Sequence, residues 1–137
     1  MATESDAQQN GAGLNLAISN TVVRLLRENT GRGPTKARTS IRDNVVVVML
    51  EQTLTKGEQN LVSRGRVEKV IEIRHEFQEA MRDECVAQIA ELTGRRVVAF
   101  MSANHVEPDL GAEIFVLDGA PDLDREIVVG SAEPGPN

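Results

Sequence analysis

Aromatic residues are what this sequence lacks most. Phe, Trp and Tyr make up 2% of its 137 residues, as three Phe with no Tyr and no Trp. Aliphatic side chains must therefore fill the interior, and the aromatic platforms on which proteins stack nucleic-acid bases are scarce. Together with a net charge of −6, this composition argues against nucleic-acid binding, although cations gather between Arg24 and Arg42.

Cysteine is almost absent. The single residue, Cys85, excludes a disulfide within the chain and any zinc or iron–sulfur site built from several cysteines. His75 is predicted on the same helix, about 15 Å away along the axis, so the two side chains cannot form a thiolate–imidazole pair. We interpret Cys85 as a small core residue and expect a reducing, cytoplasmic location.

Long apolar runs are missing as well. The longest, Val45 to Leu50, is far shorter than the ~20 residues that a membrane-spanning helix requires. The N-terminus is polar and shows no apolar segment of a secretory signal. We therefore expect no membrane span in this chain.

Composition divides the chain into three parts. We expect a flexible leader over residues 1–13, a single domain over residues 14–118 and an acidic, mobile tail over residues 119–137. In that tail, the apolar residues 127–129 offer either an edge strand or a segment that binds a partner.

Apolar periodicity predicts the elements of the domain. Apolar residues recur at three- and four-residue steps over 14–29 and over 66–93, which is the spacing of amphipathic helices. A capping box from Thr55 to Glu58 begins a short helix that ends near residue 63. Alternating or β-branched segments predict strands over residues 35–41, 45–52, 96–103 and 112–118.

A five-residue pattern ends both long helices. Residues 28–32 read Glu-Asn-Thr-Gly-Arg and residues 91–95 read Glu-Leu-Thr-Gly-Arg, each before an expected hairpin. We therefore predict an α+β fold of order αββααββ, with a four-stranded antiparallel sheet and the helices packed on one face. The repeat also suggests a pseudo-twofold relation between the halves.

The longest helix is predicted to have one apolar and one charged face. The charged residues read as a solvated face with i to i+4 pairs rather than as catalytic carboxylates. Val67 and Ile71 lie beside the apolar stripe, and from them we expect a homodimer. The stripe contains Val70, Ile73, Phe77, Met81, Cys85, Ile89 and Leu92, and the charged face contains Lys69, Glu72, Arg74, Glu76, Glu79 and Arg82.

The strongest candidate site is the loop between the first helix and the first strand. Glycines and a proline favour a tight turn there, and three cations stand close to them. Such a loop suits a phosphate, sulfate or carboxylate group, or an acidic partner. Known phosphate loops run from strand to helix, however, so a purely structural helix stop is the alternative. The candidate residues are Gly31, Arg32, Gly33, Pro34, Lys36 and Arg38.

His105, Glu107 and Asp109 form a weaker candidate, for a divalent metal. Alternate residues of an extended segment point to one side and here offer nitrogen and oxygen ligands. Pro108 and the position between two strands favour a plain hairpin connection instead. We therefore predict neither a metal nor a cofactor.

Several segments in order along the chain resemble one known family. They are residues 30–36, Leu54 and Thr55 with Glu58 and Leu61, Val70 with Arg74 and Phe77, residues 93–95 with Val97 and residues 100–102, and residues 113–117. Over residues 14–117 the chain resembles the small bacterial MpsC-type domain, labelled as part of a Na⁺-translocating, membrane-potential-generating system. The resemblance implies a link to membrane proteins that handle cations and inorganic carbon, and it supplies no catalytic residues.

The sequence shows no catalytic pair of a nucleophile and a general base, and none of a general acid and a general base. We therefore expect a protein that is not an enzyme. We expect a soluble accessory or regulatory domain that acts through protein contacts, with a membrane protein as a possible partner. The alternative is a sensor that binds a small anion or a nucleotide at residues 31–38. Nucleic-acid binding ranks behind both.

Overall fold

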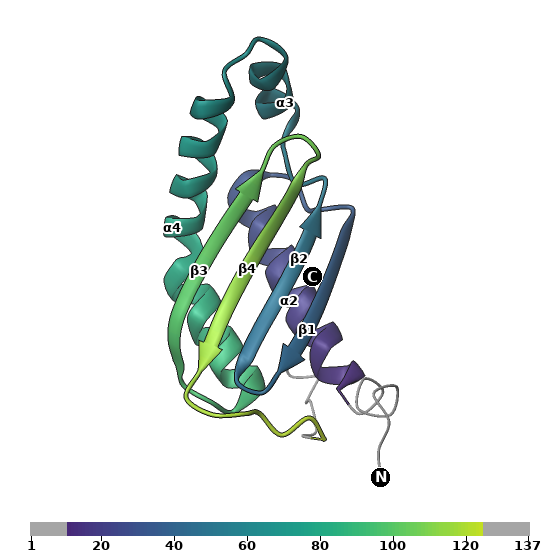
Figure 1. The fold of residues 1–137 in the computed structure, drawn as a ribbon, viewed down its shortest axis with the longest axis vertical. Coiled ribbons are helices and arrows are strands. Elements are labelled where there is room, and N and C mark those ends of the chain that lie inside the picture. The colour runs from purple at the N-terminus through teal and green to yellow at the C-terminus, as the bar shows by residue number, and fades with distance from the viewer. Residues whose placement is uncertain (1–10, 125–137) are drawn as a thin grey trace.

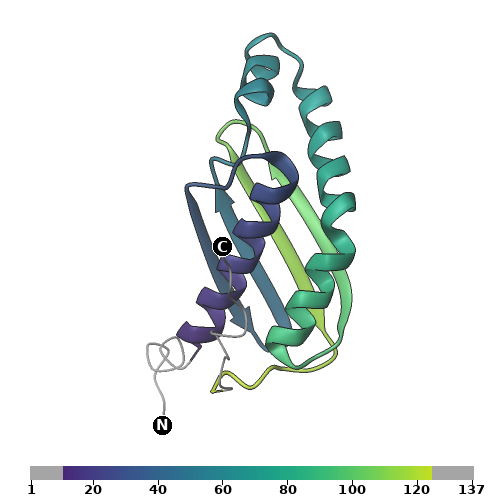
Figure 2. The same cartoon turned by 180° about the vertical axis from the view of Figure 1, so that it is seen from behind.

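Four antiparallel strands form one sheet, and two long helices lie side by side across one of its faces (Figures 1 and 2). The computed structural model describes residues 11–124. The predicted α+β fold, with its αββααββ order, is confirmed. The elements are α2 (Ala12–Thr30), β1 (Lys36–Arg42), β2 (Val45–Glu51), α3 (Lys56–Ser63), α4 (Val67–Thr93), β3 (Val97–His105) and β4 (Leu110–Leu117).

Both hairpins belong to the same sheet. The strand order is β1-β2-β4-β3, so each hairpin contributes one edge strand and one central strand. The hairpins meet where β2 pairs with β4 in antiparallel register. This is the arrangement that the predicted pseudo-twofold relation requires.

The repeated Thr-Gly-Arg ends both long helices in the same way. Gly31 and Gly94 have left-handed backbone angles, with φ of 82° and 68°, which glycine tolerates best. Each glycine N–H donates to a carbonyl of the preceding turn at 2.9 Å. The hydroxyls of Thr30 and Thr93 donate to helical carbonyls at 2.8 Å in both cases. The sequence repeat thus encodes two equivalent helix ends.

The bounds of several elements differ slightly from those predicted. Helix α2 begins at Ala12, inside the expected leader, and strands β3 and β4 are longer than expected, which leaves residues 106–109 as their connection. Residues 119–124 lie against the domain, where Leu123 packs on the core. The rest of the predicted tail, including residues 127–129, lies outside the described residues.

The core lies between the helices and the sheet, and the buried face of α4 matches the predicted stripe in part, since four of the seven predicted residues are buried. Ile73 and Phe77 are half-buried, whereas Arg74 and Gln78 are 2% and 3% exposed. The prediction that Arg74 belongs to a solvated face is therefore wrong, because this helix packs against buried polar partners. The buried residues of α4 are Val70, Arg74, Gln78, Met81, Cys85, Ile89 and Thr93.

The opposite face of the sheet, which we call the open face, is covered by no element among residues 11–124 (Figure 1). Alternate residues of each strand point to it. Apolar side chains dominate it on three strands, and Met101 among them is 49% exposed. Its residues are Lys36, Arg38, Ser40 and Arg42 on β1, Val45, Val47, Met49 and Glu51 on β2, Leu110, Ala112, Ile114 and Val116 on β4, and Ala99, Met101, Ala103 and His105 on β3.

Candidate functional site

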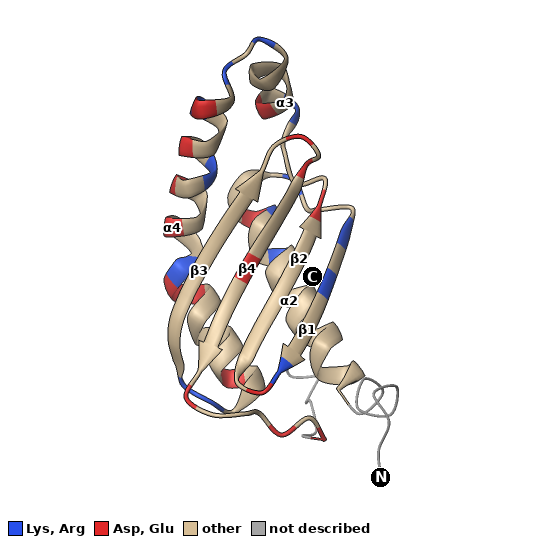
Figure 3. Ribbon diagram, in the orientation of Figure 1, with Lys and Arg blue, Asp and Glu red and all other residues tan. Residues whose placement is uncertain are grey.

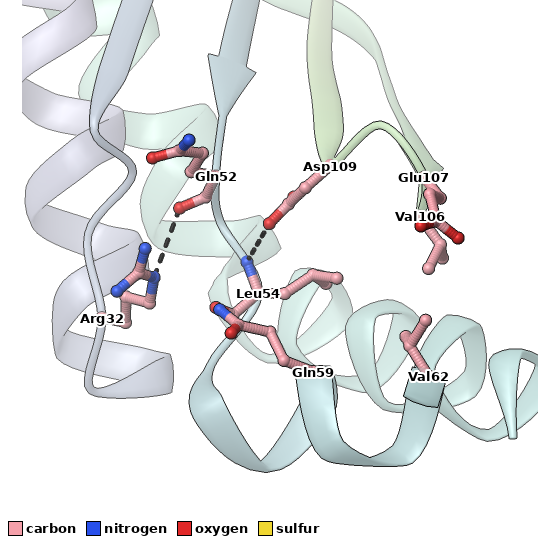
Figure 4. Close-up of a pocket in the computed structure, with 8 residues that line it drawn as sticks. All are labelled: Arg32, Gln52, Leu54, Gln59, Val62, Val106, Glu107 and Asp109. Atoms are coloured by element: carbon pink, nitrogen blue, oxygen red, sulfur yellow. Dashed lines mark hydrogen bonds between the residues drawn. The ribbon is translucent and has the colours of Figure 1, made fainter. Parts of the chain in front are cut away.

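A cleft of about 490 Å³ opens at the end of the sheet nearest α3 (Figure 4). Both candidate loops from the sequence analysis, the one before β1 and the one between β3 and β4, reach this cleft. They do so because β1, β2 and β4 are consecutive neighbours in the sheet. Arg32 comes from one loop, and Glu107 and Asp109 come from the other. Gln52, Leu54, Gln59, Val62 and Val106 complete the lining.

Asp109 clamps the chain that leaves β2. Its carboxylate accepts the backbone N–H of Thr53 at 3.1 Å and that of Leu54 at 3.0 Å, and it also accepts the Thr53 hydroxyl at 3.2 Å. Both carboxylate oxygens therefore hold in place the segment that connects β2 to α3. This clamp forms one wall of the cleft.

The predicted metal ligands do not come together as a site. Asp109 is engaged in its clamp, and His105 Nδ1 lies 2.8 Å from the carbonyl oxygen of Pro108 in its own turn. Within the part of the chain that the structure describes, no group of three His, Cys, Asp or Glu side chains is placed to hold a metal ion.

The glycine and basic loop divides into two parts. Gly31 ends α2, and Arg32 turns into the cleft, where its Nε donates to the carbonyl oxygen of Gln52 at 3.3 Å. Lys36 and Arg38 lie in β1 and point to the open face, where Arg38 is 3.9 Å from Glu51. Gly33 passes close to Arg27, since a Cβ at this glycine would lie 3.3 Å from the guanidinium. The three predicted cations therefore do not form one anion site.

A buried polar network joins α3, α4 and the sheet. Arg74 Nη1 lies 3.2 Å from Glu58 Oε1, and both side chains are buried. One helical turn further along α4, Gln78 Nε2 donates to Asn104 at 2.9 Å and to Glu113 at 3.3 Å. The carboxylate of Glu113 also accepts the hydroxyl of Ser102.

Burial perturbs the pKa of one member of this network, Glu113, and that of a neighbouring core residue, Cys85. Desolvation raises the pKa of Glu113 to about 7, although hydrogen bonds from Ser102 and Gln78 and the charge of Arg74 oppose the rise. Burial also raises the pKa of Cys85 to about 12, and the neighbouring carboxylates of Glu113 and Glu84 add to this effect. Cys85 is therefore a protonated core residue, and its predicted place in the core is confirmed.

The sequence analysis missed this network, although β4 carried a signal for it. Glu113, Phe115 and Leu117 alternate along the strand, so all three point to the same face. Since Phe115 and Leu117 are core residues, Glu113 has to be buried with them and needs polar partners. The sequence carried no comparable signal that Arg74 and Gln78 of α4 are buried.

Charge is distributed unevenly over the open face. Among the four strands, Lys and Arg are concentrated on β1, where they form the row of Lys36, Arg38 and Arg42 (Figure 3). The rows beyond it are mainly apolar, since Val47 of β2 pairs with Ile114 of β4, which pairs with Met101 of β3. The open face therefore consists of an apolar area with a basic border.

Comparison with protein families assigns the chain. The model of the family described as Na⁺-translocating membrane potential-generating system (MpsC) matches residues 12–119. The chain belongs to the MpsC family. The match covers every helix and strand described above, so the cleft and the open face are parts of the MpsC domain.

The other comparisons add no relatives. Searches of curated proteins and of solved structures found no match. Among the described helices of this MpsC domain, none has both the length and the apolar character needed to cross a bilayer.

Proposed function

We propose that this chain is a non-enzymatic accessory or regulatory domain, which acts through protein contacts within a membrane system that handles Na⁺. The observation that carries the proposal is the open face. No element of residues 11–124 covers this sheet face, which is lined by Val, Met, Ile and Ala side chains and forms a large apolar surface. Surfaces of this kind are typical of protein contact sites.

The polar groups support the same proposal. The buried carboxylates of Glu58 and Glu113 are held by side chains of the fold, and the thiol of Cys85 is protonated and buried. These groups are enclosed by the domain. The family description supplies the link to Na⁺ and the membrane, and the open face supplies a means of contact.

The proposal can be tested in the source cell. Deleting the gene should lower the Na⁺-dependent membrane potential, and the wild-type chain should restore it. Ile114→Lys places a charge in the middle of the open face and should fail to restore the potential. Leu16→Lys is the matched control, because Leu16 is 62% exposed on α2, away from the sheet face. Restoration by both variants would contradict the proposal.

A second candidate function is a sensor of small anions or nucleotides at the cleft. It is favoured by Arg32, whose guanidinium enters a cleft of about 490 Å³. The carboxylates of Glu107 and Asp109 line the same cleft and repel anions, which places this function second.

Thermal unfolding with phosphate, bicarbonate and nucleotides tests the sensor. A bound ligand at 100 times its dissociation constant adds about 2.7 kcal/mol to the free energy of unfolding. Arg32→Ala should abolish that shift, whereas Lys36→Ala, on the open face, should keep it. No shift with any of these compounds would reject the sensor.

A further inference from the structure

We propose that a second copy of this chain occupies the open face, so that the two sheets stack face to face in a homodimer. The proposal rests on the proposed function, because both assign the open face to protein contact. It adds the identity of the partner and the orientation in which the two copies meet.

The width of the open face favours a sheet as its partner. Four strands spaced about 4.8 Å apart, with seven residues at about 3.3 Å each, give a face of roughly 19 by 23 Å. A single helix is about 10 Å wide and would leave half of this face in water. A second sheet of the same size covers all of it. The accessible surface that two such faces bury, with their protruding side chains, approaches the lower limit of about 1,200 Å² for specific interfaces.

The basic border fixes the direction of the twofold axis. An axis perpendicular to the strands would place β1 of one copy on β1 of the other. The positive charges of Lys36, Arg38 and Arg42 would then face the same positive charges of the second copy. An axis parallel to the strands places β1 of one copy on β3 of the other instead. The aliphatic stems of Arg38 and Arg42 then lie over Ala103 and Ala99, with their guanidinium groups at the rim.

Side-chain size agrees with the axis parallel to the strands. In that arrangement β1 of one copy lies on β3 of the other, and β2 lies on β4. Each residue then faces the residue of the second copy that stands in the same row across the sheet. At two positions a large side chain then meets a small one, with Met49 over Ala112 and Met101 over Ser40. Such alternation lets two layers interdigitate. At the centre, Val47 faces Ile114.

The helix surface that the sequence suggested for a dimer is a poorer candidate. Val67 and Ile71 are 40% and 37% exposed near the start of α4. The charged residues Glu68, Lys69 and Glu72 stand among them, so no continuous apolar area forms. The open face carries the larger apolar surface of the two.

Sedimentation at micromolar concentration tests the interface. We expect a dimer for the wild type and a monomer for Val47→Lys and for Ile114→Lys, with far-ultraviolet circular dichroism unchanged. Ile71→Lys is the control and should remain a dimer. A monomeric wild type, or a dimer that only Ile71→Lys dissociates, would overturn the proposal.

Cysteine cross-linking tests the orientation. A mixture of Ser40→Cys and Met101→Cys chains should form a disulfide between the two variants under mild oxidation, whereas Ser40→Cys alone should not. Cys85 is buried behind the sheet and does not interfere. A disulfide formed by Ser40→Cys alone would place β1 on β1 and overturn the orientation.

The two proposals can fail independently. A monomeric wild type, combined with loss of cellular function in Ile114→Lys, would reject the dimer and keep the open face as the contact site for another protein. A dimer that Ile114→Lys dissociates without any loss of cellular function would support the dimer and reject the proposed function.

Discussion

Arg74 of α4 and Glu58 of α3 form an ion pair of 3.2 Å, in which 3% and 4% of the side chains are exposed. Glu58 is also the third residue of α3 and completes the capping box, in which its carboxylate accepts the N–H of Thr55 at 2.8 Å. Arg74 in addition donates to the carbonyl oxygen of Thr53 at 3.4 Å. One buried pair therefore holds the start of α3, the chain after β2 and the middle of α4 together.

Removing one partner of this pair should be costly. Arg74→Met leaves the carboxylate of Glu58 buried without a counter-ion, and we expect the free energy of unfolding to fall by about 3–5 kcal/mol in urea denaturation. Adding Glu58→Gln removes the buried charge and keeps a capping side chain, so the double variant should recover part of the loss. Lys69→Met is the control, because its pair with Glu72 is exposed and should contribute less than about 1 kcal/mol. An equal loss in Lys69→Met and Arg74→Met would contradict the prediction.

Glu113 should make stability depend on pH. Its pKa is about 7 in the folded protein against an ordinary value of 4.5, so the folded state binds the proton more tightly than the unfolded state. Its contribution is therefore complete below about pH 4.5 and is lost as the pH rises through 7, by on the order of 3 kcal/mol.

Glu113→Gln removes this titration. We expect the variant to lose less stability than the wild type between pH 5 and pH 8, measured by urea denaturation at each pH. Glu107→Gln, in the exposed turn between β3 and β4, is the control and should follow the wild type. Parallel pH profiles for Glu113→Gln and the wild type would count against a raised pKa.

The Asp109 clamp should matter for stability more than its exposed neighbour does. Asp109→Ala leaves the N–H groups of Thr53 and Leu54 without their acceptor, and we expect a loss of about 1–3 kcal/mol. Glu107→Ala should cost less than about 0.5 kcal/mol, as is usual for surface substitutions. Chemical denaturation of the two variants compares them directly, and similar losses in both would show that the clamp is not needed.

The two helix ends should respond equally to substitution. Gly31→Ala and Gly94→Ala force a Cβ into the left-handed region, and we expect each to lower the free energy of unfolding by about 1 kcal/mol. Gly31 has open space around the added atom, so backbone strain alone is measured there. Gly13→Ala, inside α2, should instead raise stability by up to about 1 kcal/mol because alanine is the better helix former. Equal signs in all three variants would contradict this account.

The sequence by itself determined the order of elements, the start of α3 and the ends of the two long helices. Its signals are local: apolar steps of three and four residues, the Thr55 to Glu58 capping box, and the two Thr-Gly-Arg helix ends. Each depends on side chains within a few residues of one another, so no knowledge of distant contacts was needed. The β-branched and alternating segments fixed the strands for the same reason.

Only the tertiary structure decided which side chains meet. Sheet order brought Arg32 and Asp109 to one cleft and moved Lys36 and Arg38 away to the open face. The packing of α4 buried Arg74 and Gln78 in place of Ile73 and Phe77, because Arg74 pairs with Glu58 and Gln78 donates to Glu113. These outcomes depend on contacts between residues far apart in the chain, which local periodicity does not encode. For the same reason, the apolar face that no described element covers became visible only once the four strands were placed side by side.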